Sequence, residues 1–258
     1  MQALYGRKLD AGMCPSSVRQ THAVLHRALE QARRWLISEN VAAATAPPRP
    51  RKKEIEPLDN WQARALLEAA RGERFEALFV LALTAGLRIG ELLGLKWEDE
   101  QGLERGTVRV ARTLSAAKSG PRFTPPRSGR SRSIALTEGA TIALRSYRRR
   151  QTEERLRMGT LWEDQGLVFP STTGRPLSRD AVYRRSFAPL LKRAGVPRIT
   201  LHDLRHTCAT LLLGQGMNLK YVQELLGHAS VAITRDRYSH WVPSMGERAA
   251  RAMEAALG

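Results

Sequence analysis

Residues 201 to 240 constrain the fold more than any other part of this sequence; they read LHDLRHTCATLLLGQGMNLKYVQELLGHASVAITRDRYSH. Apolar residues recur at helical spacing, which predicts a helix that begins near Asp203 and buries one face. A pair of glycines ends it, and Asn218 is suited to cap a second helix with its own apolar stripe. Gly227 fits the left-handed position that often follows a helix. The stretch therefore predicts three successive helices, with His228 in the turn before the last one.

The polar residues of this stretch are those that phosphodiester chemistry requires. Arg205 can bind a phosphate and balance its charge, and His202 and His228 can exchange protons. Tyr238 supplies a hydroxyl that can attack phosphorus. His202 and His206 are four residues apart on a helix and so form an alternative metal pair. Arg205 between them would repel a cation and no cysteine or carboxylate cluster completes such a site, so no metal is expected.

A second block lies upstream, where TAGLRIGELLGLKW contains Arg88 and Glu91. Together, this block, HDLRH, LLGH and a tyrosine on the following helix resemble the signature of the tyrosine recombinases of the phage-integrase type. The resemblance covers roughly residues 55 to 245. Taken singly, Tyr238 would more often be a half-buried core residue and Arg88 a solvated charge. The presence of both blocks, in the order and spacing of the family, favours catalytic roles for Arg88 and Tyr238 over these structural roles.

The resemblance implies a mechanism. Arg88 and Arg205 would hold the non-bridging oxygens of a scissile phosphate, where negative charge concentrates in the transition state. Tyr238 would attack in line, with His202 as the acid/base partner and His228 donating to the phosphate; Glu91 is expected in support. The products would be a 3′-phosphotyrosyl link and a free 5′-hydroxyl. Because the link preserves the phosphodiester energy, no cofactor is expected.

Charge points to the same class of partner. The 258 residues carry a formal net charge of +17, with a pI near 11.0. A chain this basic usually meets a polyanion, so double-stranded DNA is the expected partner. No apolar run approaches the roughly 20 residues of a membrane-spanning helix, and the first residues lack the apolar core of a signal peptide. Cys14 and Cys208 alone suggest no disulfide framework, and we expect a cytoplasmic, nucleoid-associated protein.

The expected fold is mostly α with a small antiparallel β-sheet, a catalytic domain preceded by a partial helical core-binding domain. Two helices are predicted for residues 1–46. The resemblance implies that they correspond to about half of the family's usual core-binding domain, which clamps DNA. A helical hairpin packed on the main domain is an alternative for them. Residues 47–56 predict a basic, proline-rich linker, and 57–258 a catalytic domain with a C-terminal tail helix.

Within the predicted catalytic domain the hydrophobic period changes with position. Asp59 and Gln62 predict a capping box for a helix through Ala70. Further helices are expected at 75–86, after Arg88, from Thr137 and after Ser178. Alternation predicts strands at 107–114 and 133–136, with hairpin connections at 117–132 and another short strand at 167–170.

Basic residues outside the two signature blocks are candidates for phosphate contacts, although those on the helix after Ser178 could instead form a solvated face. They lie in the linker, in the strand hairpin and on the helix after Ser178: Arg51, Lys52, Lys53, Arg130, Arg132, Arg179, Arg184 and Arg185.

The hairpin departs from the family pattern. Relatives usually carry a lysine there as general acid to the leaving 5′ oxygen, whereas this chain reads Pro126-Arg127-Ser128. Arginine releases a proton poorly, because its pKa exceeds ~12. Lys118, on the other side of the loop, is the alternative acid, or else a solvated charge.

The resemblance also implies a homotetramer on paired DNA sites, joined by the tail helix at 244–258, and accessory DNA-bending or directionality proteins. A tail folded back on its own domain is the alternative. Two other functions stay open, a DNA-binding regulator with an inactive recombinase fold and a type IB-like topoisomerase.

Overall fold

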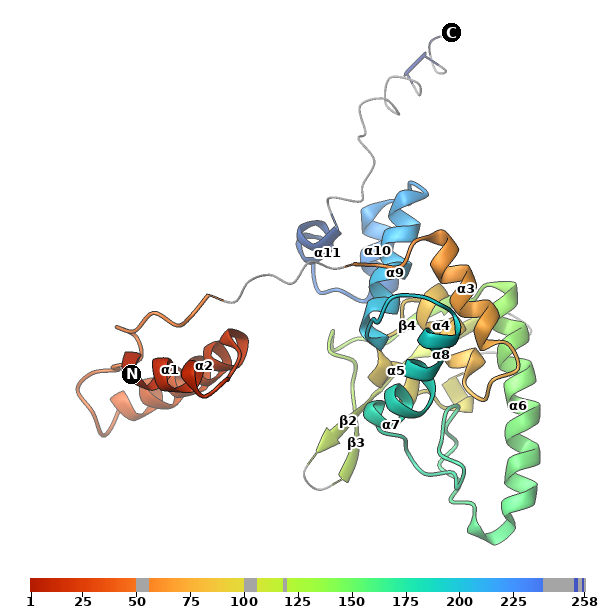
Figure 1. Ribbon diagram of the computed structural model, residues 1–258, viewed down its shortest axis with the longest axis horizontal. Coiled ribbons are helices and arrows are strands. Elements are labelled where there is room, and N and C mark those ends of the chain that lie inside the picture. The colour runs from red at the N-terminus through yellow and green to blue at the C-terminus, as the bar shows by residue number, and fades with distance from the viewer. Residues whose placement is uncertain (50–55, 100–105, 118–119, 239–252, 255–256, 258) are drawn as a thin grey trace. The chain divides into compact units, whose positions relative to one another are not determined.

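The structure is a computed structural model that describes residues 1–49, 56–99, 106–117, 120–238, 253–254 and 257. The chain divides into two compact units, Met1–Glu54 and Ile55–Gly258 (Figure 1). No helix within the described residues is long and apolar enough to cross a membrane.

The first unit contains the two helices that its sequence predicts. These are α1 (Gln2–Asp10) and α2 (Pro15–Arg33), and Pro15 occupies the first turn of α2, where its missing N–H costs nothing. Tyr5 of α1 is buried and its hydroxyl is 2.8 Å from Nδ1 of His22 on α2. This small contact joins the two helices.

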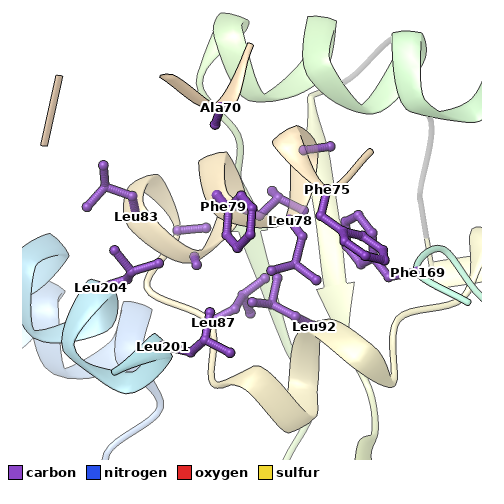
Figure 2. Packing of buried hydrophobic residues seen from close by; sticks show 14 of the residues in the cluster. Ala70, Phe75, Leu78, Phe79, Leu83, Leu87, Leu92, Phe169, Leu201 and Leu204 are labelled. Atoms are coloured by element: carbon purple, nitrogen blue, oxygen red, sulfur yellow. The ribbon is translucent and has the colours of Figure 1, made fainter. Parts of the chain in front are cut away.

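The second unit is built around one buried helix, α4 (Glu76–Thr84). It is apolar on all sides, as a central helix must be, and it contacts α3 (Asn60–Ala70), α5 (Ile89–Leu93), α6 (Glu138–Met158) and α9 (Leu201–Gly214). Figure 2 shows Leu78 and Phe79 of α4 facing Leu87 and Leu92, with Leu204 of α9 to one side.

Further described helical segments of this unit include two short turns that were not predicted and four helices that lie where helices were predicted. They are the short turns Trp97–Asp99 and Gly159–Leu161, then α7 (Arg179–Val182), α8 (Ala188–Arg193), α10 (Leu219–Leu226) and α11 (Val231–Tyr238).

Side-chain caps begin several helices where the sequence predicts them. Asp59 and Gln62 form a capping box on α3, Thr137 caps α6, and Ser178 caps α7. The predicted helix after Ser178 is interrupted at Tyr183–Phe187, which forms a π turn. Pro189 follows this turn; it lacks an N–H and crowds the preceding turn of an α-helix, which favours the wider winding.

The strands are shorter and more numerous than predicted. Instead of one strand at 107–114 there are β1 (Thr107–Val110) and β2 (Thr113–Ala117). β1 pairs antiparallel with β4 (Arg132–Ala135), with Val108 opposite Ile134. The described residues thus form two-stranded sheets, and the predicted mostly helical class with antiparallel β-structure is confirmed.

Two strand predictions are wrong. Residues 120–124, predicted as a connection, form β3 (Gly120–Thr124), which pairs antiparallel with β2. Backbone pairing at an edge tolerates the proline and the exposed side chains of this segment. Residues 167–170, predicted as a strand, make only isolated bridges through Leu167 and Pro170.

Close packing of α5 against β2 gives a test of the fold. A Cβ atom on Gly90 would lie 2.8 Å from Cγ2 of Thr113 and 2.9 Å from the carbonyl oxygen of Leu114. We therefore expect Gly90→Ala to lower the free energy of unfolding by about 1–3 kcal/mol, measured by urea denaturation. Gly139→Ala is the control, because a Cβ there meets nothing within 4 Å. It should keep or gain stability, and equal losses in both variants would contradict the packing.

Candidate active site

Arg88 lies immediately before α5, where extended backbone aims its side chain at the end of α10. Its Nη1 donates to Oε1 of Glu91 at 2.9 Å and to the carbonyl oxygen of Leu226 at 3.3 Å. Nη2 donates to the carbonyl oxygen of Gly227 at 3.3 Å. These contacts hold the guanidinium, whose side chain remains 24% exposed.

Glu91 is a fully buried carboxylate shared by two arginines. It accepts from Nη1 of Arg88 and from both terminal nitrogens of Arg132, the shorter contact being 2.7 Å. Burial raises the pKa of Glu91, but the hydrogen bond and charge of Arg132, and then the charge of Arg88, outweigh burial and leave it lowered. Glu91 is therefore ionised at neutral pH and anchors both cations.

Arg205 is the most deeply buried cation of the site, with 1% exposure. From α9 it donates through Nη1 to the carbonyl oxygen of Gly86 at 2.7 Å and through Nη2 to that of Leu226 at 2.5 Å. Burial, and next the charge of Arg88, lower its pKa to about 9, so it stays charged at neutral pH. A buried cation held by neutral carbonyls is suited to receive an anion.

Gly227 fixes the shape of the turn that these arginines contact. It closes α10 with φ 62° and ψ 48°, the left-handed conformation that the sequence predicts. A Cβ there would also lie 2.9 Å from Nη1 of Arg132, whose Nε donates to the carbonyl oxygen of Leu225 at 2.9 Å. Glycine is thus required for both the turn and the close approach.

A pocket of about 330 Å³ opens beside this turn. It gathers four arginines and two histidines from separate parts of the second unit, and none of its described lining residues is acidic. The charged and titratable lining residues are Arg88, Arg127, His202, Arg205, His228 and Arg237. Such a lining favours a phosphate group.

The two pocket histidines are neutral at physiological pH. His228 is buried in the turn after α10, and its Nδ1 is 2.8 Å from Oγ1 of Thr234 on α11. Burial, and next the charge of Arg205, lower its pKa to about 3. Surrounding protein atoms, and then Arg205, also lower the pKa of His202. Both rings are therefore uncharged at neutral pH, and each can offer one N–H donor and one acceptor nitrogen.

Tyr238 lies beside the pocket without lining it. It ends α11 with no exposed surface, packed against Ala209, Leu213, Val222 and Leu226. Its hydroxyl is 2.5 Å from Nδ1 of His206 on α9. Burial raises the pKa of Tyr238 to about 12, so the hydroxyl keeps its proton.

Among the other predicted site residues, one lines the pocket and several lie outside the described part of the chain. Arg127 lines the pocket, whereas Lys118, Arg51, Lys52 and Lys53 lie outside the described residues. The tail helix predicted at 244–258 also lies mostly outside them.

Arg132, predicted as a DNA contact, is only 13% exposed and is paired with Glu91. The other basic candidates, Arg130, Arg179, Arg184 and Arg185, are exposed.

Two residues of the site were missed in the sequence. Arg237 lines the pocket from α11, and its position next to Tyr238 was an available signal. His206 was considered only as part of a metal pair with His202; the two rings do meet edge to face, with centroids 4.7 Å apart. Within the described part of the chain, no group of three or more His, Cys, Asp or Glu side chains is placed to hold a metal ion.

Comparisons with known proteins agree on one family. Residues 56–244 match the family model described as the phage integrase family. The chain is 35% identical over 203 residues to a tyrosine recombinase XerC-like protein of Caldanaerobacter subterraneus subsp. tengcongensis, covering 74% of this chain and 51% of that protein. It is 32% identical over 235 residues to an integrase of Streptomyces ambofaciens, covering 86% and 59%. The chain thus spans about half to two thirds of the length of these relatives.

Solved structures agree on the fold. The Tn1549 transposon integrase in complex with transposon right end DNA superposes with a TM-score of 0.76 at 22% identity, covering 98% of this chain and 84% of that one. A lambda integrase dimer bound to a core site gives 0.61 at 22% identity, covering 92% and 77%. The predicted fold class is therefore confirmed.

The Glu91 pairing gives a second prediction. Glu91→Gln leaves two guanidinium groups without their buried counter-charge. We therefore expect the free energy of unfolding, measured by urea denaturation, to fall by about 3–5 kcal/mol. Glu98→Gln is the matched control, since Glu98 also pairs with an arginine, Arg112, but is 65% exposed. The free energy of unfolding of Glu98→Gln should fall by no more than about 1 kcal/mol. A similarly small decrease in Glu91→Gln would refute the anchoring role of Glu91.

Proposed function

Because the chain belongs to the phage integrase family, we propose that it is a site-specific DNA recombinase that cleaves and rejoins duplex DNA through a 3′-phosphotyrosyl intermediate. The observation that carries this proposal is the pocket, where Arg88, His202, Arg205 and His228 converge from three separate segments of the chain beside the helix that ends in Tyr238. A pocket lined by cations and neutral imidazoles suits a phosphodiester in the course of displacement.

The proposed reaction follows from these groups. Arg88 and Arg205 bind the non-bridging oxygens of the scissile phosphate and stabilise the charge that builds on them. The Tyr238 oxygen bonds to phosphorus while the bond to the 5′ oxygen breaks. His202 serves as the acid/base partner in this step, and His228 donates a hydrogen bond to the phosphate. The freed 5′-hydroxyl of a partner strand reverses the step. Phosphodiester energy is conserved, so the step needs neither ATP nor a metal.

The proposed DNA contacts extend beyond the pocket. Relatives solved in complex with DNA include the Tn1549 and lambda integrases, which supports duplex DNA as the partner. Exposed Arg130, Arg179, Arg184 and Arg185 would contact phosphates, as would the linker cations. We propose residues 1–46 as the core-binding part, 47–56 as the linker and 57–258 as the catalytic domain. A homotetramer on paired sites, accessory proteins and association with the nucleoid complete the proposal.

A second candidate is a DNA-binding regulator with an inactive recombinase fold. The burial of Tyr238 favours this alternative, because a tyrosine without exposed surface does not attack a phosphate from that position. The two candidates differ in one product, a covalent protein–DNA adduct.

The nucleophile is tested by Tyr238→Phe. This variant should bind DNA as the unchanged protein does, because only a hydroxyl is removed, yet it should form no covalent adduct on a denaturing gel. Tyr221→Phe is the control, since Tyr221 is 46% exposed on α10, and it should still form adduct. If Tyr238→Phe still forms an adduct, Tyr238 is not the nucleophile. If the unchanged protein forms no adduct, the DNA-binding regulator is favoured.

The proton donor to the leaving 5′ oxygen is tested by Arg127→Lys. Arg127 lines the pocket from the hairpin, and a lysine there would release a proton far more readily. Since a positioned general acid contributes about 10²–10⁴-fold, single-turnover cleavage should accelerate by about tenfold or more. The control is Arg130→Lys in the same loop, which should change nothing.

Lys118→Ala should slow cleavage only modestly. If Arg127→Lys is neutral and Lys118→Ala abolishes cleavage, Lys118 is the acid and the assignment of Arg127 fails.

A further inference from the structure

The backbone at His228 is held from within its own turn. Its N–H donates to the carbonyl oxygen of Gln223 at 3.1 Å, and Nε2 of Gln223 donates to the carbonyl oxygen of His228 at 2.5 Å. Both residues are only 9% exposed. Because these contacts hold the backbone of the turn, the freedom that remains to this histidine is the rotation of its ring.

The ring of His228 is held by Thr234 of α11. Oγ1 of Thr234 is 2.8 Å from Nδ1 of the ring. Thr234 is fully buried in the first turn of α11, and side chains on a helix incline toward its N-terminus. This inclination brings the hydroxyl back toward the turn that carries His228. The ring also lines the pocket, and within the described residues its other nitrogen, Nε2, makes no hydrogen bond.

The direction of the hydrogen bond between Thr234 and His228 follows from what a buried hydroxyl needs. A threonine hydroxyl carries one proton, and leaving that proton without an acceptor in the interior costs free energy. In the part of the chain that the structure describes, the hydroxyl of Thr234 makes no hydrogen bond besides that to Nδ1 of His228. The hydroxyl therefore donates, and Nδ1 is the unprotonated nitrogen of the ring.

The charge state of the ring then locates its proton. Burial, and next the charge of Arg205, lower the pKa of His228 to about 3, so the ring is neutral at pH 7. A neutral imidazole carries one ring proton, and since Nδ1 accepts from Thr234, this proton lies on Nε2. The ring thus offers an N–H donor on the side away from Thr234, and an anion in the pocket requires such donors.

We propose that Thr234 is a positioning residue that fixes the ring of His228 as a donor through Nε2 to the phosphate group in the pocket. This inference deepens the proposed function and rests on it, since that function places a scissile phosphate there. With the opposite tautomer, a lone pair on Nε2 would face the phosphate oxygens. The repulsion would grow as negative charge builds on these oxygens in the transition state, whereas a donor fixed in advance stabilises that charge.

The first test locates the ring proton in the unchanged protein without DNA. In a nitrogen NMR spectrum at pH 7, the protonated and unprotonated nitrogens of a neutral histidine differ widely in chemical shift. Their couplings to the ring hydrogens tell Nδ1 from Nε2, and loss of the signals in His228→Gln assigns them. We expect the proton of His228 on Nε2. A proton on Nδ1 overturns the proposal, whatever the chain does to DNA.

The second test removes the hydroxyl with Thr234→Val, which keeps the shape of the side chain. The Nδ1 resonance of His228 should shift, because Nδ1 loses its donor, and a fraction of the rings should carry the proton on Nδ1. The single-turnover rate of adduct formation should fall by roughly 2- to 12-fold, the range that corresponds to one net hydrogen bond. Affinity for uncleaved DNA should stay within about twofold, because the donor acts mainly on charge that develops in the transition state.

Thr234→Ser and Thr210→Val are the matched controls. Thr234→Ser keeps the hydroxyl, so it should return both the Nδ1 resonance and the rate toward those of the unchanged protein. Thr210 is also buried, but on α9, and it donates to the carbonyl oxygens of His206 and Thr207. Thr210→Val should therefore leave the resonances of His228 and the rate as they are.

Two outcomes of this comparison contradict the proposal. If Thr234→Val leaves both nitrogen resonances of His228 unchanged, Thr234 does not set the ring, even where adduct formation slows. If Thr210→Val slows adduct formation as much as Thr234→Val does, the loss of rate comes from loosened packing and not from the ring of His228.

The resonances separate this inference from the function beneath it. If the unchanged protein forms no adduct, the recombinase proposal fails, whereas the nitrogen resonances of the unchanged protein and Thr234→Val still decide whether Thr234 sets the ring of His228. If Thr234→Val does not fold, the place of the ring proton in the unchanged protein decides it.

Discussion

The carbonyl groups at the end of α10 organise the site, because three arginines donate to them from three different parts of the chain. Arg132 contacts the carbonyl of Leu225, while Arg88 and Arg205 share that of Leu226. A helix C-terminus carries partial negative charge and unsatisfied oxygens, so it can hold cations that would otherwise repel one another. Together with the Glu91 carboxylate, it brings separate segments to one turn and leaves the pocket positive.

The sequence predicted the parts of the fold and of the site that depend on near neighbours. The caps at Asp59, Thr137 and Ser178, and the left-handed Gly227, each involve residues within a few positions of one another. Such contacts are visible in a linear pattern because the same few residues make and satisfy them. The family signature added the grouping of Arg88 with His202 and Arg205, which local periodicity does not contain.

Contacts between distant segments were not predictable in the same way. Strand β3 forms because its backbone pairs with β2, although its own residues are typical of a loop. Arg132, in a stretch rich in serine and arginine, was predicted only as a DNA contact, because its partner Glu91 lies 41 residues away in the sequence. For Tyr238, helical spacing gave the shared face with Thr234, but not whether that face meets the core or the phosphate.

The burial of the Arg205 guanidinium couples the stability of the folded domain to the binding of an anion. Its guanidinium donates to two uncharged carbonyls, and its lowered pKa shows that the folded chain holds this proton less tightly than solvent-exposed arginine does. An anion in the pocket relieves that cost, so proton affinity, phosphate affinity and folding are thermodynamically linked. A bound phosphate group would then help to hold the folded domain together.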